Sequence, residues 1–221
     1  MEVARQRLSR QEQKAQTKAR LIAAGRTVFA RQGFHRALLE EVAEQAGYST
    51  GAIYANFGNK EDLFLAVLDE HVSARLRAVE HAVSDATTPS QRLRAGADNW
   101  MEFLRKEPDW YRLFIEFWSY AQRDPELRAR VATRFAAFPQ ANAQWIEQGA
   151  RELDIALPEG LAGAVGTLFT AVADGLALMK LLDPEAVPDE LFGDALSALH
   201  QLTLQAAQQD AAALRNAAQN P

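Results

Sequence analysis

Two side chains that can hold an anion follow a run of small residues. Tyr54 offers a hydroxyl group, and Lys60 offers an ammonium group at the start of an expected helix. The free backbone N–H groups of a helix start attract anions, and a cation at that position is mildly disfavoured by the helix dipole unless an anion joins it. The preceding small residues Thr50, Gly51 and Ala52 would allow close approach. This combination indicates a segment that approaches an anionic surface.

Each of these side chains also has an ordinary structural explanation. Tyr54 could be a half-buried ring beside Phe57, and Lys60 could be a first-turn surface residue. Ile53 and Phe57 already supply the inner face of the expected helix, which favours an exposed Tyr54.

A helix-turn-helix pattern surrounds these residues. A short helix is expected at about 39–46, and Gly47 ends it. Ser49 is a good N-cap for a second short helix at about 50–57, because its hydroxyl can accept a first-turn N–H. A turn of about three residues would therefore join the two helices.

The rest of the chain also predicts helices, since no segment alternates apolar and polar residues over a useful strand length. A first helix is expected at about 12–32, with Gly33 as a left-handed cap after which Phe34 folds back. A long helix is expected at 60–85. Further helices are expected at 89–106, 109–122, 125–153, 158–182 and 188–208. Pro139 should kink or split its helix.

Composition limits the kind of protein. The 221 residues include no cysteine, which excludes disulfides and thiolate metal sites and fits a reducing cytoplasm. No charge-free apolar run approaches the length of a membrane span, and the basic N-terminus lacks the apolar core of a signal peptide. We therefore expect a soluble, cytoplasmic protein.

Charge is divided unevenly along the chain, whose formal net charge is −5. Residues 1–60 carry ten Lys and Arg against five Asp and Glu, a net charge of +5, so residues 61–221 carry −10. A basic first quarter on an acidic remainder indicates an anionic partner held by the N-terminal part. A solvated basic tail is the alternative explanation.

Residues 14–68 resemble the DNA-binding domain of the tetracycline-repressor (TetR) family. The matching positions, all in register, are Gly33-Phe34, Val42-Ala43, Ala46-Gly47, Ser49, Gly51, Ile53-Tyr54, Phe57, Lys60 and Leu63. The remaining chain fits the all-helical regulatory domain of that family in length and layout. The resemblance departs at Ala37-Leu38, where many relatives carry hydroxyl residues that cap the second helix, and at Asn56, where the family often has His.

The resemblance implies an all-α protein with two domains. Residues 1–60 would form a basic arm and a three-helix helix-turn-helix DNA-binding domain, with the recognition helix at about 50–57. Residues 61–208 would form a helical ligand-binding and dimerisation domain. Residues 209–221 lack an apolar stripe and are expected to fray.

The recognition helix is expected to enter the major groove of double-stranded DNA, which admits one α-helix. By resemblance, Tyr54 and Lys60 hold phosphates. The arm, which lies along the DNA backbone or reaches the minor groove, contains Arg5, Arg7, Arg10, Lys14 and Lys18. The DNA-contacting residues are expected to be Lys14, Lys18, Ser49, Thr50, Gly51, Ala52, Tyr54, Ala55, Asn56 and Lys60.

The resemblance also implies an effector pocket among the middle helices, which are rich in aromatic residues. Its lining is expected to include His71, Asn99, Trp100, Phe103, Trp110, Phe114, Phe117, Trp118 and Asp174. Such a pocket suits a flat or apolar ligand, or a lipophilic cation held by ring faces. For any single aromatic residue, a place in the plain core is the better interpretation. Glu116 falls off the aromatic face and is expected to pair with Arg112 at the surface.

The helices at 158–182 and 188–208 are apolar over broad faces, which indicates burial on several sides. By resemblance they would form a four-helix bundle with the same helices of a second copy. The interface is expected to include Val165, Phe169, Val172, Gly175, Leu196 and Leu199. A C2 homodimer matches a palindromic operator.

These features predict a ligand-responsive transcriptional regulator, a repressor that binds a palindromic operator as a dimer and is released by a small apolar or aromatic effector. An activator, or a regulator without a ligand, would share the same DNA-binding motif and stays an alternative. A helical enzyme or carrier lacks support, because the four histidines are scattered and there is no HExxH motif or glycine-rich phosphate loop. No catalytic residue, metal or cofactor is therefore expected.

Overall fold

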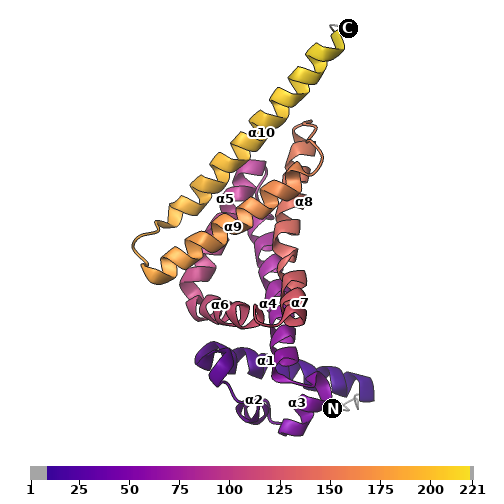
Figure 1. Cartoon of the computed structure of the whole chain (residues 1–221), viewed down its shortest axis with the longest axis vertical. Coiled ribbons are helices and arrows are strands. Elements are labelled where there is room, and N and C mark those ends of the chain that lie inside the picture. Colours follow the sequence, from indigo (N-terminus) through magenta and orange to yellow (C-terminus); the bar gives the residue numbers. More distant parts are fainter. Residues whose placement is uncertain (1–8, 220–221) are drawn as a thin grey trace, which may run out of the picture. The chain divides into compact units, whose positions relative to one another are not determined.

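The computed structural model describes residues 9–219, with the backbone alone for residues 203, 204, 207, 208 and 210–219. Its helices are α1 (Arg10–Arg36), α2 (Leu39–Ala46), α3 (Thr50–Phe57), α4 (Lys60–Val83), α5 (Pro89–Lys106), α6 (Pro108–Ala121), α7 (Pro125–Phe135), α8 (Ala137–Glu152), α9 (Leu161–Leu182) and α10 (Asp189–Gln219). The described residues contain no β-strand (Figure 1). The prediction of an all-α protein is confirmed.

Two compact units make up the chain. The first contains the residues up to His71 together with Arg112–Arg128, and the second contains Val72–Tyr111 and the residues from Ala129 onward. The boundary expected from the sequence, at residue 60, divides the chain differently. The difference arises because the start of α4 and much of α6 supply side chains to the core of the first unit.

Aromatic rings form that core. The ring of Phe64 in α4 lies 5.2 Å from Phe29 and 5.3 Å from Phe34, both in α1, measured between centroids. Phe117 of α6 stacks on Phe64 at 4.0 Å, and all four side chains are almost fully buried. Each aromatic pair of this kind adds about 0.5–1.5 kcal/mol beyond the area that it buries. The cluster therefore ties α1, α4 and α6 together.

Phe34 reaches the cluster because α1 is interrupted at Gly33. Gly33 adopts φ 80° and ψ 166°, a region restricted almost entirely to glycine, and one further turn extends to Arg36. The predicted interruption at Gly33 and the fold-back of Phe34 are confirmed. The prediction of a left-handed cap at Gly33 is wrong, because its ψ lies outside the left-handed helical region and α1 is capped at Ala37. A Cβ atom at Gly33 would collide with the carboxylate of Glu116 in α6.

Helices α8 and α9 approach closely in the second unit. A Cβ atom at Gly166 of α9 would collide with the backbone of Pro139 and Ala143 in α8. Next to this contact, Nδ2 of Asn142 donates to Oγ1 of Thr170 at 3.1 Å. Glycine at this crossing lets the two backbones meet, and the hydrogen bond fixes how they are aligned.

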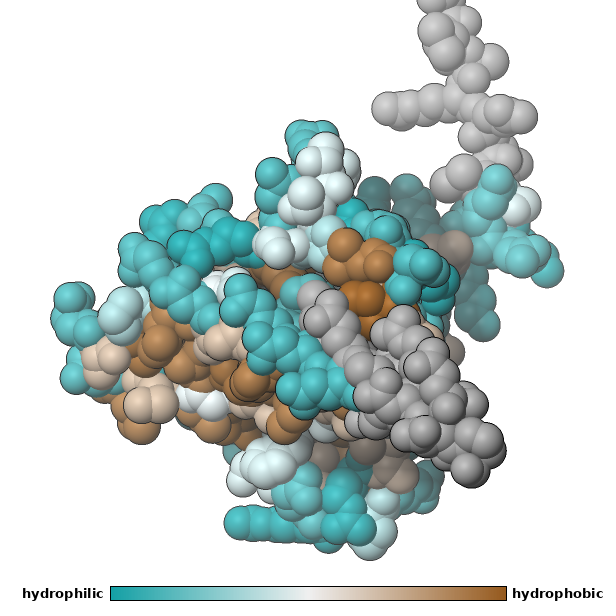
Figure 2. Space-filling model, turned by 90° about the horizontal axis from the view of Figure 1, so that it is seen from above, coloured by the Kyte–Doolittle hydropathy of each residue, from teal (hydrophilic) through white to brown (hydrophobic). Residues whose placement is uncertain are grey.

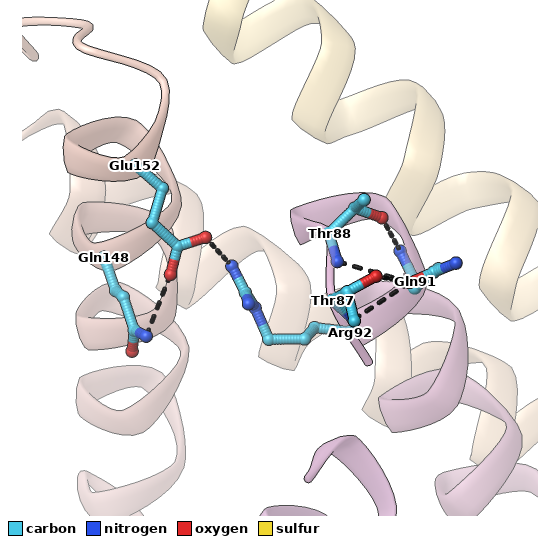
Figure 3. A network of polar contacts seen from close by, with 6 residues as sticks. All are labelled: Thr87, Thr88, Gln91, Arg92, Gln148 and Glu152. Carbon is cyan, nitrogen blue, oxygen red and sulfur yellow. Dashed lines mark hydrogen bonds and ion pairs between the residues drawn. The ribbon is translucent and has the colours of Figure 1, made fainter. Parts of the chain in front are cut away.

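A polar network joins the start of α5 to the end of α8 (Figure 3). The hydroxyl of Thr88 accepts the N–H of Gln91, and Oε1 of Gln91 accepts the N–H of Thr88, each at 3.2 Å. Arg92 forms an ion pair with Glu152, which also accepts a hydrogen bond from Gln148 at 3.0 Å. Because the carboxylate is partly exposed, the ion pair contributes modestly to stability.

The predicted split of a helix near Pro139 is present. The helix expected at 125–153 is divided into α7 and α8 at Ala136, because Pro139 lacks the N–H that would bond to the carbonyl of Phe135. Helix α10 continues to Gln219, although an end near residue 208 and a frayed tail were expected. The tail is rich in alanine, the strongest helix former.

Helix α9 is, among the described residues, the one helix whose length and hydropathy would allow it to cross a membrane. It nevertheless packs against α8 and α10, and Asp174 lies near its middle. We interpret α9 as a packing helix of the second unit.

We expect Gly33→Ala to lower the free energy of unfolding by about 1–3 kcal/mol, because the backbone conformation is unfavourable for alanine and the new methyl group meets Glu116. Urea denaturation measures the loss. Gly47→Ala is the matched control. Its φ of 75° is also positive, but a Cβ there meets no atom within 4 Å, so the expected cost is about 1 kcal/mol. A smaller loss at Gly33 than at Gly47 would contradict the contact with Glu116.

Candidate functional site

Helices α2 and α3 are joined by the turn that the sequence predicted. Gly47 ends α2 with φ 75° and ψ 32°, and the N–H of Tyr48 donates to the carbonyl of Ala43 at 2.9 Å. Ser49 occupies the N-cap position of α3, but its hydroxyl makes no capping hydrogen bond. Because Ser49 is also exposed, its hydroxyl is available to a partner outside the chain.

Helix α3 has an inner and an outer face. Ile53 and Phe57 are buried, whereas Gly51 and Ala55 are exposed and Tyr54 is 55% exposed. The predicted exposure of Tyr54 is confirmed. The outer face therefore presents one aromatic hydroxyl among small residues, and the half-buried Thr50 and Ala52 flank it.

The exposed face of α1 places positive charge beside α3. Lys14 and Lys18 are exposed, and the ammonium of Lys18 lies 5.7 Å from the centroid of the Phe57 ring in α3. Arg10, the first residue of α1, is exposed as well. The other residues expected in the basic arm, Arg5 and Arg7, lie outside the described residues.

Two of the predicted DNA-contacting side chains are turned toward the protein. Nζ of Lys60 donates to the carbonyl of His35 at 3.1 Å and lies 4.8 Å from the centroid of Phe34. Nδ2 of Asn56 donates to the carbonyl of Ala52 at 2.8 Å within α3. Each of these contacts uses one N–H donor, so the ammonium and the amide keep further donors for a phosphate, but the contacts hold both side chains against the protein.

Glu116 adds a negative charge at the end of α1. Its Oε1 accepts the N–H of His35 at 2.9 Å, and in the same region the hydroxyl of Tyr120 donates to Oε1 of Glu61 at 2.8 Å. Burial lowers the pKa of Lys60, while the charges of Glu61 and Glu116 counteract that effect. The sequence predicted only a surface pairing of Glu116, because a partner 81 residues away leaves no local signal.

Four residues of the predicted effector pocket belong to one cluster in the second unit: Asn99, Trp100, Phe103 and Asp174. The Trp100 ring lies 5.4 Å from Phe103 and meets Tyr111 edge-on at 6.0 Å. The hydroxyl of Tyr111 donates to Oδ1 of Asp174 at 2.9 Å. Burial raises the pKa of Asp174 to about 6, against the opposing effect of this hydrogen bond.

Arg75 of α4, which sequence reasoning missed, lies in the same cluster. Its guanidinium carbon is 4.3 Å from the ring centroid of Phe103 and 6.0 Å from that of Trp100. Its Nη2 donates to Oδ1 of Asn99 at 2.8 Å. No motif surrounds Arg75 in the sequence, so packing alone reveals it.

The other residues predicted for the pocket are divided between the two units. Phe117 belongs to the aromatic core of the first unit, and the buried His71 and the half-buried Phe114 belong to the same unit. Trp118 is 51% exposed, and Trp110 is buried in the second unit. A surface pocket of about 480 Å³ lies at the connection between α8 and α9, and none of the predicted residues lines it.

The residues predicted for a dimer interface differ in exposure. Val165, Phe169 and Leu196 are buried within the single chain, so they help to pack the second unit and present little surface to a partner. Gly175 is exposed, and Val172 and Leu199 are half-buried.

Two family descriptions match the chain. Residues 21–67 match "Bacterial regulatory proteins, tetR family", and residues 89–205 match "BetI-type transcriptional repressor, C-terminal". The second match alone covers more than half of the sequence. The chain belongs to the TetR family. It is a DNA-binding transcriptional regulator and not an enzyme, as the sequence predicted.

Other members of the TetR family show how far the similarity extends. The transcriptional activator FasR of Mycolicibacterium smegmatis is 34% identical over 127 residues, which make up 58% of this chain and 56% of FasR. FadR from Bacillus subtilis in complex with stearoyl-CoA has a TM-score of 0.65 at 19% identity, covering 84% of this chain and 97% of FadR. A regulator from Saccharomonospora viridis in complex with choline has a TM-score of 0.67 at 18% identity, covering 85% and 96%. These two structures share the fold of this TetR-family chain.

We expect Lys60→Met to lower the free energy of unfolding by about 1 kcal/mol, because it removes the hydrogen bond to His35 and the ammonium above Phe34. Tyr54→Phe serves as the control and should change stability by less than about 0.5 kcal/mol, since the Tyr54 side chain is exposed. Urea denaturation of both variants measures the difference. A Lys60→Met variant as stable as the wild type would show that the ammonium is not held at the end of α1.

Proposed function

We propose that this TetR-family regulator is a repressor that binds a two-fold symmetric operator as a dimer and leaves it when a small effector binds. The outer face of α3 carries the proposal, because it exposes small residues and Tyr54 while Ile53 and Phe57 anchor the opposite face. The match to a repressor family over residues 89–205 supports repression. FasR is an activator, so activation is the alternative.

The proposed DNA contacts divide into base contacts and phosphate contacts. The hydroxyls of Ser49 and Thr50 would meet base edges, and the methyl of Thr50 would meet a thymine methyl. Lys14, Lys18 and the hydroxyl of Tyr54 would hold phosphates, which position the protein without selecting sequence. Lys60 would add a phosphate contact through the N–H donors that it does not use for the carbonyl of His35.

A second copy of the chain would cover the exposed apolar face of α9. Leu168, Met179 and Leu182 are 52%, 55% and 88% exposed, and the exposed Gly175 lies on the same face of the helix. In Figure 1 the connection between α9 and α10 lies at the left, and Figure 2 shows hydrophobic surface on the left of its view. A C2 dimer buries the same patch on both copies.

The effector would bind in the second unit, at the cluster that contains Trp100, Phe103 and Tyr111. Structural neighbours hold stearoyl-CoA and choline, so the fold admits ligands of opposite charge. The regulator would act in the cytoplasm, where it meets both DNA and metabolites. An effector that binds the DNA-free state more tightly than the DNA-bound state weakens operator binding by that difference.

Selection of random duplex DNA by the purified protein, at near-physiological salt, tests the proposed function. We expect enrichment of a two-fold symmetric sequence with half-sites about one helical turn or more apart. Thr50→Ala should relax the preferred base at one position of each half-site, whereas Lys106→Ala, far from the helix-turn-helix in sequence, should leave the selected sequence unchanged. A reporter gene behind the selected site then distinguishes repression from activation. Recovery of random sequence would overturn the proposal.

We expect Gly175→Arg to convert the dimer into a monomer, because a charged side chain would enter the apolar interface unpaired. A Cβ at Gly175 meets no atom within 4 Å of the single chain, so the monomer should fold with an unchanged circular dichroism spectrum. Light scattering after size-exclusion chromatography measures the mass. Gln144→Arg, at an exposed position of α8, is the control and should stay dimeric. A persistent Gly175→Arg dimer would place the interface elsewhere.

A further inference from the structure

Arg75 is a cation in a largely apolar site. Its guanidinium lies against Phe103 and Trp100, at 4.3 and 6.0 Å from the ring centroids. The acceptor of its Nη2 is the neutral side-chain carbonyl of Asn99. Burial lowers the pKa of Arg75, and the charge of Glu107 counteracts this effect. An arginine stays charged under such conditions. The site therefore contains a positive charge, and no carboxylate in the described chain accepts a hydrogen bond from Nε of Arg75.

Two buried donors of this cluster have no hydrogen-bond partner in the described chain. They are Nε of Arg75 and Nε1 of Trp100. Both groups can donate a hydrogen bond and neither can accept one. Buried donors without acceptors are rare in native proteins, and each one requires an explanation. An acceptor that comes from outside the chain would satisfy both.

The same geometry argues against a cationic ligand at this place. Ring faces of tryptophan and phenylalanine attract cations. For this reason the sequence analysis included a lipophilic cation among the possible ligands. In the structure, Arg75 already occupies the neighbourhood of both rings. A second cation would meet a like charge there. Of the two carboxylates to consider, Asp174 accepts the hydroxyl hydrogen of Tyr111, and the charge of Glu107 acts on Arg75 itself.

We propose that the effector presents an oxyanion, a carboxylate or a phosphate, to Arg75 and Trp100. One of its oxygens accepts hydrogen bonds from Nε of Arg75 and Nε1 of Trp100, and Asn99 holds the guanidinium in place through Nη2. The apolar part of the effector packs on Phe103 and the neighbouring rings. This assignment rests on the proposed effector site of the second unit and names the chemical class of its ligand.

Four probes with the same ten-carbon chain test the assignment: decanoate, decyl phosphate, decyltrimethylammonium and decan-1-ol. Isothermal titration calorimetry of the full chain, below the micelle concentration of each probe, measures their affinities. We expect at least one anionic probe to bind tenfold or more tightly than the cation and the alcohol. The comparison of decanoate with decyl phosphate decides which oxyanion fits.

Arg75→Met should weaken binding of the preferred anionic probe by tenfold or more, because it removes the charge and the Nε donor while keeping the apolar stem. Arg77→Met, an exposed position on the same helix, is the matched control and should change nothing. Trp100→Phe keeps a ring and removes only the Nε1 donor, so a loss of about threefold or more is expected. This variant keeps the test decisive if Arg75→Met does not fold.

Three results would overturn the assignment. They are equal or tighter binding of decyltrimethylammonium, the absence of binding by both anionic probes, and an unchanged affinity of the anionic probe in Arg75→Met and Trp100→Phe. DNA selection by the wild-type protein, without any probe, separates this inference from the proposed function. A protein that selects an operator but shows no preference for anions keeps the proposed function and loses the proposed effector class.

Discussion

The aromatic cluster around Phe64 is the interaction on which the DNA-reading surface depends. Phe34 can join it only because Gly33 permits a backbone conformation that other residues avoid, and Phe117 adds α6 to the same packing. The cluster fixes α1, and α1 supports α2 and α3. The position of the exposed face of α3 therefore depends on rings that are buried elsewhere in the first unit. Loss of one of these rings would therefore displace the exposed face of α3, although no residue of α3 is changed.

Local signals explain why the helix-turn-helix was predictable. Gly47, Ser49 and the apolar spacing of Ile53 and Phe57 act within a few residues, and each occupies its predicted place. Contacts between distant residues leave no such signal. Pairing of Arg75 with Asn99 spans 24 residues, and it is visible only once α4 and α5 are packed together. For the same reason, the sequence assigned Val165 and Phe169 to a partner copy, although they are buried within the chain: an apolar pattern shows that a residue is covered and does not show by what.

Helices α4 and α6 each contribute residues to both units. Helix α4 contains Phe64 of the first core and Arg75 of the second cluster, about three helical turns apart. Helix α6 likewise contains Tyr111 and Phe117. Since an effector changes DNA affinity only through a difference between two states, a ligand that moves Arg75 or Tyr111 acts on helices that also hold the first core together. A coupling of about 1–3 kcal/mol, usual for allosteric proteins, is of the same order as two or three aromatic pairs, so a partial change in this packing would be enough to account for it.

The proposed effector and DNA are both anions, and the chain would recognise them through different physics. Lys14 and Lys18 are exposed, so their attraction to phosphates is screened by salt beyond about 8 Å at physiological ionic strength and weakens as counterions compete. Arg75 is half-buried against the rings of Phe103 and Trp100, and salt screens a partly buried charge less. Residues 61–221 carry a net charge of −10, but because salt screens these charges too, they repel a free anion only weakly. The local donors Nε and Nε1 therefore decide whether an anion binds, and a change of salt acts on operator binding far more than on effector binding.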